Sequence, residues 1–221
     1  EDNMMYLILK DLLLQKRMLG IMFLYAALFG FSFKGMSEGQ LIAVISMIGY
    51  MLVMMGAAWE EKNNSDVLWN SLPVQRWKIV GARYLSVFVY VALVTPIYWV
   101  TITGLTFLGF PLGTSTINLE GILGGTVAVI LMSSLYLPIY YALGYAKSRY
   151  LNFVVFFGIF FLASALPRLL PEKPGWVDPL LGRLPAVQSD ALILVGIGVF
   201  VALVMGVSFL LSVLFYGRRE F

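Results

Sequence analysis

The sequence predicts an all-α membrane protein with six transmembrane helices, an N-terminal interfacial helix and a short cytoplasmic helix between the second and third spans. Of its 221 residues, 60% are hydrophobic and 12% are charged, and the mean hydropathy is +0.88. A soluble domain carries about 25% charged residues, so this chain is too apolar to be one. Its apolar residues form continuous runs, which favours helices over a membrane barrel of strands. We therefore expect residues 1–221 to form a single transmembrane domain.

Residues 3–17, which read NMMYLILKDLLLQKR, are expected to form an amphipathic helix in the headgroup region. Its polar residues fall within roughly one face of a helix, and its leucines lie elsewhere. A charged start to the first span is the alternative interpretation. The residues that define the polar face are Asn3, Lys10, Asp11 and Arg17, and the candidate headgroup contacts are Lys10, Asp11, Lys16 and Arg17.

Six apolar runs follow, each close to the length that a helix needs to cross a bilayer, which is about 20 residues for about 30 Å of hydrocarbon. The expected spans are residues 18–33, 41–59, 79–110, 122–145, 151–170 and 191–216. The third run is longer than one span requires. Pro96 and Pro138 are expected to kink the third and fourth helices, because proline removes a backbone hydrogen bond.

The distribution of basic residues predicts that both termini are cytoplasmic. With the N-terminus inside, the inner side collects eleven basic residues and the outer side keeps four. Cytoplasmic loops carry the excess of lysine and arginine, so this orientation is favoured. Arg83, inside the third run, is expected to reach back to the inner interface by snorkelling. The inner residues are Lys10, Lys16, Arg17, Lys62, Arg76, Lys78, Arg83, Lys147, Arg149, Arg218 and Arg219, and the outer ones are Lys34, Arg168, Lys173 and Arg183.

The longest strongly polar segment, residues 60–83, lies on this cytoplasmic side and reads EEKNNSDVLWNSLPVQRWKIVGAR. Ser65 or Asp66 can cap a short helix, which must stop near Leu72 because the residue before proline is pushed out of helical geometry. Leucine and tryptophan side chains share one face of that helix by their i, i+3 and i+4 spacing. A solvated loop gains nothing from such a face, so we expect it to contact headgroups or another protein. The residues of the face are Leu68, Trp69 and Leu72.

The stretch EEKNNSDVLWNSLPVQRWKIVGARYLS resembles the cytoplasmic loop of small ABC-2-type transporter permeases, in which a Glu-Lys-Asn-polar-Ser-Asp segment leads to LLNSLPVSR and an ARYLS-like start of the third helix. Similar proteins by size and layout are the membrane subunit of phenol-soluble-modulin exporters and permeases beside peptide-antibiotic resistance ATPases. The chain departs from the pattern at Trp69 and Trp77, which are bulkier than the family's residues.

The resemblance implies a dimer of six-span subunits on two cytosolic ATPase subunits. It places the N-terminal helix at the interface and makes the short loop helix the coupling helix that contacts the ATPase. The implied contact residues are Asp66, Leu68, Trp69, Leu72, Pro73 and Arg76.

The chain carries no nucleotide-binding loop of the form Gly-x-x-x-x-Gly-Lys-Ser/Thr, so ATP and Mg are expected on the partner ATPase and no cofactor on this chain. It also has no cysteine and no histidine, which excludes thiol nucleophiles, imidazole bases and histidine-based zinc sites. Glu60 and Glu61 resemble the paired glutamates of intramembrane prenyl-protein proteases, but those enzymes need histidines for their metal. We therefore expect a transporter subunit rather than an enzyme.

The outer segment 171–190 (PEKPGWVDPLLGRLPAVQSD) holds four prolines and Trp176, a rigid stretch suited to the interface. In the family, short helices after the fifth span cover the exit of the translocation path. We map that outer gate to this segment, and an ordinary surface loop is the alternative. The candidate gate residues are Trp176 and Pro179.

Methionines gather in the second run and are candidates for the translocation path, because this adaptable side chain suits varied apolar ligands. Filling of the protein core is the alternative. Gly49 and Gly56 of the same run are expected to allow close helix approach at a dimer seam. No charged residue is expected deep in a span, which weighs against an ion-coupled carrier. The methionines are Met47, Met51, Met54 and Met55.

These observations predict the permease subunit of an ATP-driven exporter in a bacterial plasma membrane. The expected cargo is an amphipathic or hydrophobic peptide, because the spans offer apolar and aromatic surface, although a lipid-linked molecule fits equally well. The expected partners are two copies of a cytosolic ABC ATPase, a second permease copy in a homodimer, and membrane lipid. A non-transporting regulatory or immunity subunit of a related ATPase complex is the alternative.

Overall fold

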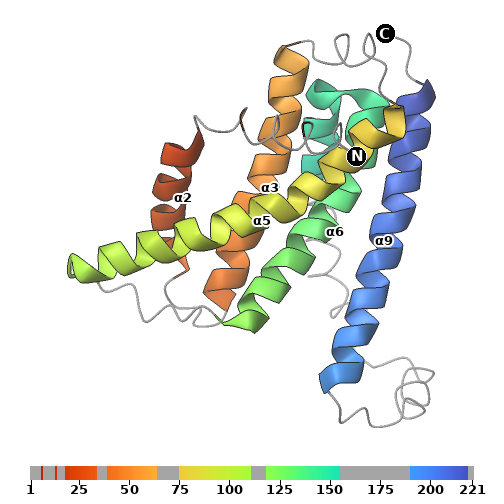
Figure 1. Cartoon of the computed structure of the whole chain (residues 1–221). Coiled ribbons are helices and arrows are strands. Elements are labelled where there is room, and N and C mark those ends of the chain that lie inside the picture. Colours follow the sequence, from red (N-terminus) through yellow and green to blue (C-terminus); the bar gives the residue numbers. More distant parts are fainter. Residues whose placement is uncertain are drawn as a thin grey trace, which may run out of the picture.

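The computed structural model describes residues 6, 13, 18–33, 39–63, 75–110, 118–154 and 190–218, and within these residues all regular structure is helical (Figure 1). The long elements are α2 (Leu19–Ser32), α3 (Gly39–Lys62), α5 (Arg76–Phe107), α6 (Leu119–Leu143) and α9 (Asp190–Arg218). Four stretches are long and apolar enough to cross a membrane, namely α3, α5, α6 and the Leu194–Arg218 part of α9, whereas α2 is a shorter apolar helix. The prediction of an all-α membrane protein is thereby confirmed, and the number of six spans stays a prediction.

Five of the expected spans coincide with described helices, and their ends differ by a few residues. The fifth, residues 151–170, lies outside the described residues except for 151–154, which are helical. Of the expected interfacial helix only Tyr6 and Leu13 are described, and both are helical and exposed.

α3, α6 and α9 lie side by side, and α5 crosses them obliquely to reach α2 (Figure 1). α5 has 32 residues, which corresponds to about 48 Å of helix. An upright span needs only about 30 Å, and a helix that exceeds this length is accommodated by tilting. The oblique course of α5 therefore accounts for the unusually long third apolar run.

Glycines bring α3 and α6 close together. A Cβ atom built on Gly49 would lie 2.9 Å from Cγ2 of Val129, and one on Gly125 would lie 2.8 Å from Cβ of Ile45. Small residues allow membrane helices to approach until their backbones are near contact. Gly49 was expected at a dimer seam, but its open side is filled by α6 of the same chain.

Pro138 lies inside α6 and leaves a backbone carbonyl free to accept a hydrogen bond from another helix. It has no N–H, so the carbonyl of Ser134, four residues earlier, receives no helical hydrogen bond from that position. The Ser208 hydroxyl of α9 donates to this carbonyl at 2.6 Å and lies 2.5 Å from the Tyr84 hydroxyl of α5. In a membrane such a carbonyl must be satisfied from within the protein, and here α9 supplies the donor.

A row of tyrosine rings crosses the bundle from α3 through α6 to α9. Tyr50 meets Tyr136 edge-on at 6.1 Å, and Tyr136 stacks on Tyr140 at 6.0 Å between ring centroids. Tyr140 contacts Tyr141, and Tyr141 contacts Tyr216, both at 5.1 Å. Aromatic pairs in these arrangements attract each other beyond the burial of their area. We call these five residues the tyrosine row.

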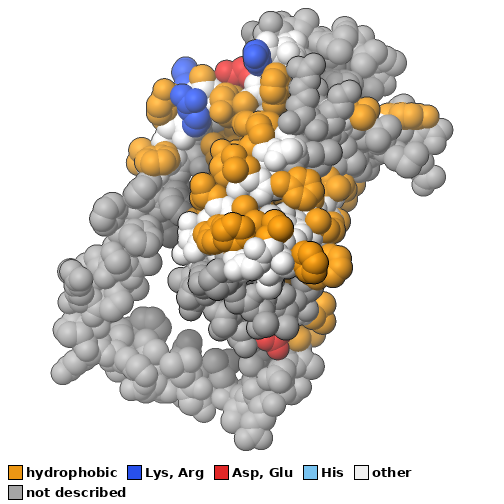
Figure 2. Space-filling model, turned by 90° about the vertical axis from the view of Figure 1, so that its left-hand side faces the viewer, with side chains coloured by type: hydrophobic (Ala, Val, Ile, Leu, Met, Phe, Trp, Pro, Cys, Tyr) orange, Lys and Arg blue, Asp and Glu red, His pale blue; other side chains and the backbone are white. Residues whose placement is uncertain are grey.

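Hydrophobic side chains are spread over the described surface on the face drawn in Figure 2, and the lysine and arginine side chains gather toward one end. The outward side of α9 is especially apolar, with Leu203 64% exposed and Leu210 62% exposed. Exposing such a surface to water would cost free energy, so it is expected to face lipid or another membrane subunit.

Candidate functional site

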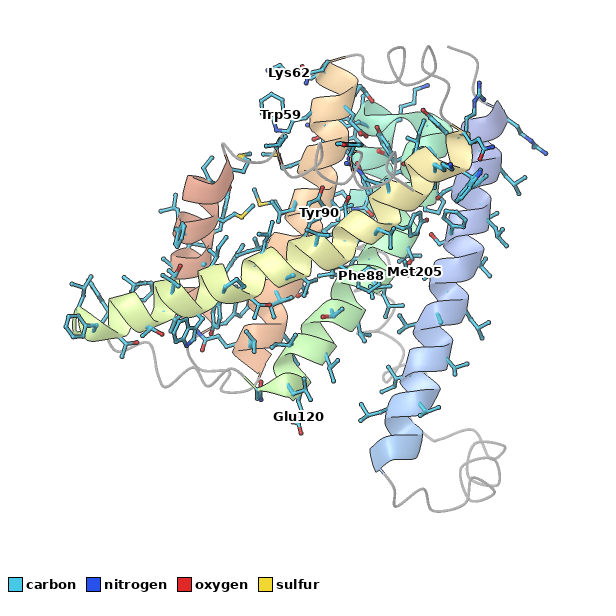
Figure 3. All side chains as sticks on the ribbon, viewed as in Figure 1. Trp59, Lys62, Phe88, Tyr90, Glu120 and Met205 are labelled. Carbon is cyan, nitrogen blue, oxygen red and sulfur yellow. The ribbon has the colours of Figure 1, made fainter. Side chains whose placement is uncertain are left out.

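Every described lysine and arginine lies at one end of the bundle, which we call the charged end. This end contains the last turn of α3, the first turns of α5, residues 145–154 and the last turn of α9. In Figure 3, Trp59 and Lys62 lie at this end and Glu120 lies at the opposite one. The loop of residues 64–74, which contains the expected coupling helix, leaves α3 and enters α5 at the charged end.

The predicted ATPase contacts fall mostly in this loop. Arg76 is the only one of the six within the described residues. Its guanidinium donates hydrogen bonds to the carbonyls of Tyr216, at 3.2 Å, and Gly217, at 2.8 Å, and lies over the Tyr216 ring. A cation at these carbonyls is favourable because the C-terminal end of a helix is electronegative. Arg76 therefore joins the first residue of α5 to the end of α9. The other five predicted contacts, Asp66, Leu68, Trp69, Leu72 and Pro73, lie outside the described residues.

Arg83 forms a buried ion pair with Glu60, so the expectation that it snorkels to the interface is wrong. Its Nη2 lies 3.4 Å from Oε2 of Glu60, and the Arg83 side chain is 2% exposed. The guanidinium rests on Gly56, where an added Cβ would lie 2.8 Å from both terminal nitrogens. The Tyr140 hydroxyl donates to the same Glu60 oxygen at 3.4 Å. A nearby carboxylate and a space opened by glycine hold Arg83 inside the bundle, and Gly56 thus serves this contact rather than a dimer seam.

Glu61 fastens α3 to the helix that follows α6. Its carboxylate accepts hydrogen bonds from the backbone N–H groups of Tyr145 and Ala146, the latter at 3.3 Å. Residues 145–154 are helical, so Glu61 caps the N-terminal end of that helix, where a negative charge is stabilised. Gly144 adopts a φ of +79°, which lets the chain turn between α6 and this helix. The expected loop between spans four and five is therefore helical.

Further contacts surround the charged end. The Asn152 amide donates to the Tyr50 hydroxyl and ties residues 145–154 to α3. Arg149 donates a hydrogen bond of 2.9 Å to the Tyr150 hydroxyl, which raises the pKa of the guanidinium. The cations of Lys62 and Lys78 lie over tryptophan rings, 5.0 Å from Trp59 and 5.7 Å from Trp77 respectively. Aromatic rings paired with cations are typical of the membrane interface.

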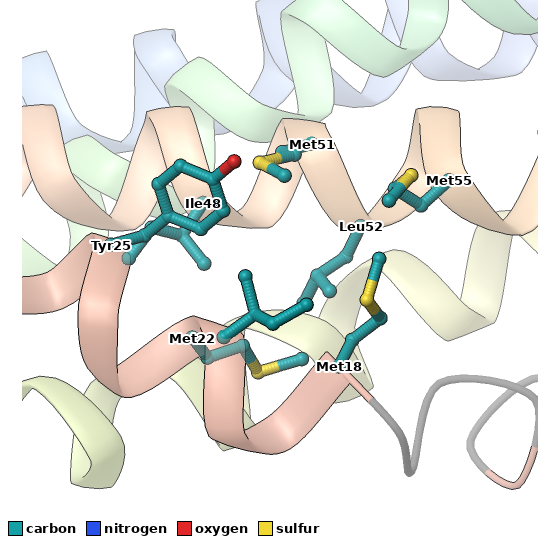
Figure 4. Close-up of a pocket in the computed structure, with 8 residues that line it drawn as sticks. Met18, Met22, Tyr25, Ile48, Met51, Leu52 and Met55 are labelled. Atoms are coloured by element: carbon teal, nitrogen blue, oxygen red, sulfur yellow. The ribbon is translucent and has the colours of Figure 1, made fainter.

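The second-span methionines do not form one surface. Met51 and Met55 line a small apolar pocket between α3 and α2, opposite Met18 and Met22 (Figure 4). Met47 is 42% exposed, and Met54 is half-buried against the core. The role of these residues in a translocation path stays a prediction.

The remaining predicted site residues, Lys10, Asp11, Lys16, Arg17, Trp176 and Pro179, lie outside the described residues. Within the described part of the chain, no group of His, Cys, Asp and Glu residues could hold a metal ion.

The described helices thus belong to a membrane protein whose lysine and arginine side chains gather at one end. A family model described as ABC-2 family transporter protein matches residues 6–217, and the chain belongs to this family. Its members are membrane components of ABC transporters, which associate with an ABC ATPase and do not themselves hydrolyse ATP. A search of curated proteins found no match. The resemblance to ABC-2 permeases is confirmed, and the closer similarity to phenol-soluble-modulin exporters stays a prediction.

Sequence reasoning missed the partners of the charged segment. Tyr140, Gly56 and the end of α9 are ordinary apolar-run residues in the sequence, and nothing in their spacing relates them to residues 60–83. The available signal was Arg83 itself, since an ionisable residue inside an apolar run requires a partner.

Proposed function

We propose that this chain is the membrane-spanning permease of an ATP-driven exporter that carries amphipathic or hydrophobic peptides out of the cytoplasm. Its membership of the ABC-2 family supports the permease role. The observation that supports the mechanism is that the helix ends on both sides of residues 64–74 are bound to other helices. On the α3 side Glu60 and Glu61 bind other helices, and on the α5 side Arg76 and Arg83 do so. A loop that merely connected two spans would not need such anchors.

In the proposed mechanism, ATP binding closes two motor subunits and moves the short helix of residues 66–72. Because the loop is anchored on both sides, this movement reaches α6 and α9 as well as α3 and α5. The first, second and fifth spans of two permease copies then rearrange around a shared path. A change of this kind requires the loop to bind the motor differently in the two states. ATP and Mg are held by the motor subunits.

The proposed assembly is a homodimer of permeases with two ATPase copies in a bacterial plasma membrane, with both termini cytoplasmic. The N-terminal helix lies at the interface, with Lys10 and Arg17 on its polar face. Trp176 and Pro179 belong to the outer gate. The cluster of described cations at one end supports this orientation under the positive-inside rule.

The peptide cargo is inferred from the surface that the spans offer. Buried residues of the described helices are mostly apolar or aromatic, and the described basic residues stay at the charged end. An ion or sugar phosphate would find few partners along such spans, because burying an unpaired charge is costly. An amphipathic peptide can bury its apolar face there, and so can a lipid-linked molecule.

Reconstitution into proteoliposomes tests the proposal. The permease is combined with its partner ABC ATPase, and a fluorescent amphipathic helical peptide is the probe. ATP should drive the peptide across the membrane from the ATPase side, and an ATPase lacking its nucleotide-binding lysine should not. A permease that binds and stimulates the ATPase but moves no peptide would instead be the regulatory or immunity subunit. A fluorescent lipid-linked sugar, tested in parallel, separates the two kinds of cargo.

A further inference from the structure

Stability alone does not explain why Glu60 and Arg83 form a buried ion pair. Removing two charges from water is expensive, and replacing a buried pair by well-packed apolar side chains is often neutral or stabilising. The pair is 3.4 Å apart and nearly inaccessible to water. Apolar residues of similar length would satisfy the packing at lower cost, so packing alone does not explain the pair.

The two residues occupy the two flanks of the same loop. Glu60 lies in the last turn of α3, which ends at Lys62, and Arg83 lies seven residues after Arg76, the first residue of α5. Seven residues of helix rise about 10 Å, so Arg83 lies about two turns into α5, whereas Glu60 lies within one turn of the end of α3. The ends of the 64–74 loop are therefore connected through the bundle as well as through the chain.

Tyr140 extends this connection to the rest of the charged end. Its hydroxyl donates to Glu60, and its ring stacks on Tyr136 and contacts Tyr141. Through Tyr141 the tyrosine row reaches Tyr216 on α9, whose carbonyl also binds Arg76. The described parts of α3, α5 and α6 thus meet at the Glu60 carboxylate, and α9 is connected to it through the tyrosine row.

An ion pair differs from an apolar contact in its geometry. Apolar burial is non-directional, so two apolar helices can slide along each other with little loss. A buried ion pair depends on the distance between its two charges, because separating them inside the bundle leaves each charge unpaired, so it favours one register of the helices. Gly56 sharpens this register, because an added Cβ there would collide with the guanidinium.

We propose that Arg83 is a positioning residue for energy coupling: by holding Glu60 it makes the end of α3 and the start of α5 move as one body when the loop between them is displaced. The inference rests on the proposed function, because it assumes that a motor displaces the loop. Without the pair, the two helix ends would move separately, and the motion would be lost in bending them rather than passed to α6 and α9.

The first test uses the permease–ATPase complex in proteoliposomes with the labelled amphipathic peptide. Glu60→Met with Arg83→Met replaces both charges and should leave the protein folded, with a thermal midpoint near that of the parent. ATPase activity should persist, while peptide moved per ATP hydrolysed should fall at least about fivefold, the low end of coupling between sites. A double variant that transports as many peptides per ATP as the parent would overturn the proposal.

Two glycine-to-alanine variants test whether the position of the Arg83 guanidinium matters when both charges of the ion pair are kept. Gly56→Ala pushes the guanidinium away, whereas Gly104→Ala, also in a long helix, meets nothing within 4 Å. Gly56→Ala should lower the number of peptides moved per ATP, and Gly104→Ala should not. Equal values in the two variants would contradict the proposed register.

A second readout needs no cargo. The chain has no cysteine, so spin labels can be placed singly by Lys62→Cys and Lys78→Cys, one on each helix end. In the parent complex the distance between the labels should be the same with and without ATP, and in the Glu60→Met, Arg83→Met background it should change with ATP. An unchanged distance in that background refutes the inference. If the labels behave as expected but the parent moves no peptide, only the proposed cargo or transport function fails.

Discussion

The role of Glu61 follows from its contacts in the folded protein and not from its neighbours in the sequence. It follows Glu60 in a polar segment, where two adjacent carboxylates suggest solvated charge. In the structure each has a separate task, since Glu60 pairs with Arg83 and Glu61 caps the helix that begins at Tyr145. Adjacent residues point about 100° apart on a helix, so they can serve different partners.

Replacing Glu61 by Gln should destabilise the protein by about 0.5–1.5 kcal/mol, because the amide keeps the size but loses the charge that favours a helix N-terminus. The measurement is thermal unfolding of the purified permease in detergent. Lys62→Gln is the matched control, since it changes the exposed neighbouring charge that lies over Trp59. The cap would be irrelevant to stability if both variants unfolded at the same temperature.

At the scale of helices, the junction of α5, α6 and α9 depends on a hydrogen bond that a proline makes available. Pro138 leaves the Ser134 carbonyl for the Ser208 hydroxyl, and Ser208 also contacts Tyr84. Tyr84 lies within reach of Ser212 as well, at 2.9 Å. The three helices are thus joined by polar groups within an otherwise apolar interface.

The contribution of Ser208 should depend on Pro138. Ser208→Ala should cost about 0.6–1.7 kcal/mol, the range of hydrogen bonds between membrane helices. In a Pro138→Ala background the alanine N–H can bind the Ser134 carbonyl within α6, so the same substitution should cost less. The double-mutant cycle, measured by unfolding in mixed micelles, gives the coupling energy. Strict additivity of the two substitutions would show that the proline and the serine act independently.

The helices themselves were predictable from the sequence, whereas their contacts were not. Long apolar runs locate α3, α5, α6 and α9 because lipid imposes both length and helical hydrogen bonding. Residues 146–150 were expected as a loop because their charges interrupt the apolar run, yet Gly144 makes the turn and the helix resumes at once. Runs that are apolar on all sides do not reveal which side faces another helix. The ion pair of Arg83, the cap by Glu61 and the tyrosine row therefore escaped prediction.

At the scale of the whole molecule, the described lysine and arginine side chains gather at one end. α3, α6 and α9 all end at the charged end, and α5 begins there (Figure 1). The positive-inside rule predicts that this end faces the cytoplasm.

Cysteine labelling in intact cells should verify this orientation. Lys62→Cys should be protected from a membrane-impermeant maleimide until the cells are opened, because Lys62 is at the charged end. Glu120→Cys, at the start of α6 on the opposite end, should react from outside. Since the native chain has no cysteine, the unmodified protein is the blank. The reverse pattern would place the loop of residues 64–74 outside the cell and remove it from any cytosolic motor.

The assembly with its motor can be tested through the loop helix. Leu68→Asp with Trp69→Ala removes the apolar face expected on residues 66–72, so the motor should lose the surface that it pushes. The permease should still insert, because the spans are unchanged, but ATP-driven peptide transport should fall at least about tenfold, which corresponds to about 1.4 kcal/mol of lost coupling. Asn70→Asp is the matched control, since it adds the same charge on the opposite side of that helix. Copurification with the ATPase, its stimulated activity and transport are measured together. If the double variant retains all three at the level of the Asn70→Asp control, the apolar face does not receive the motor's force, and the anchored flanks of the loop must be reached by another surface.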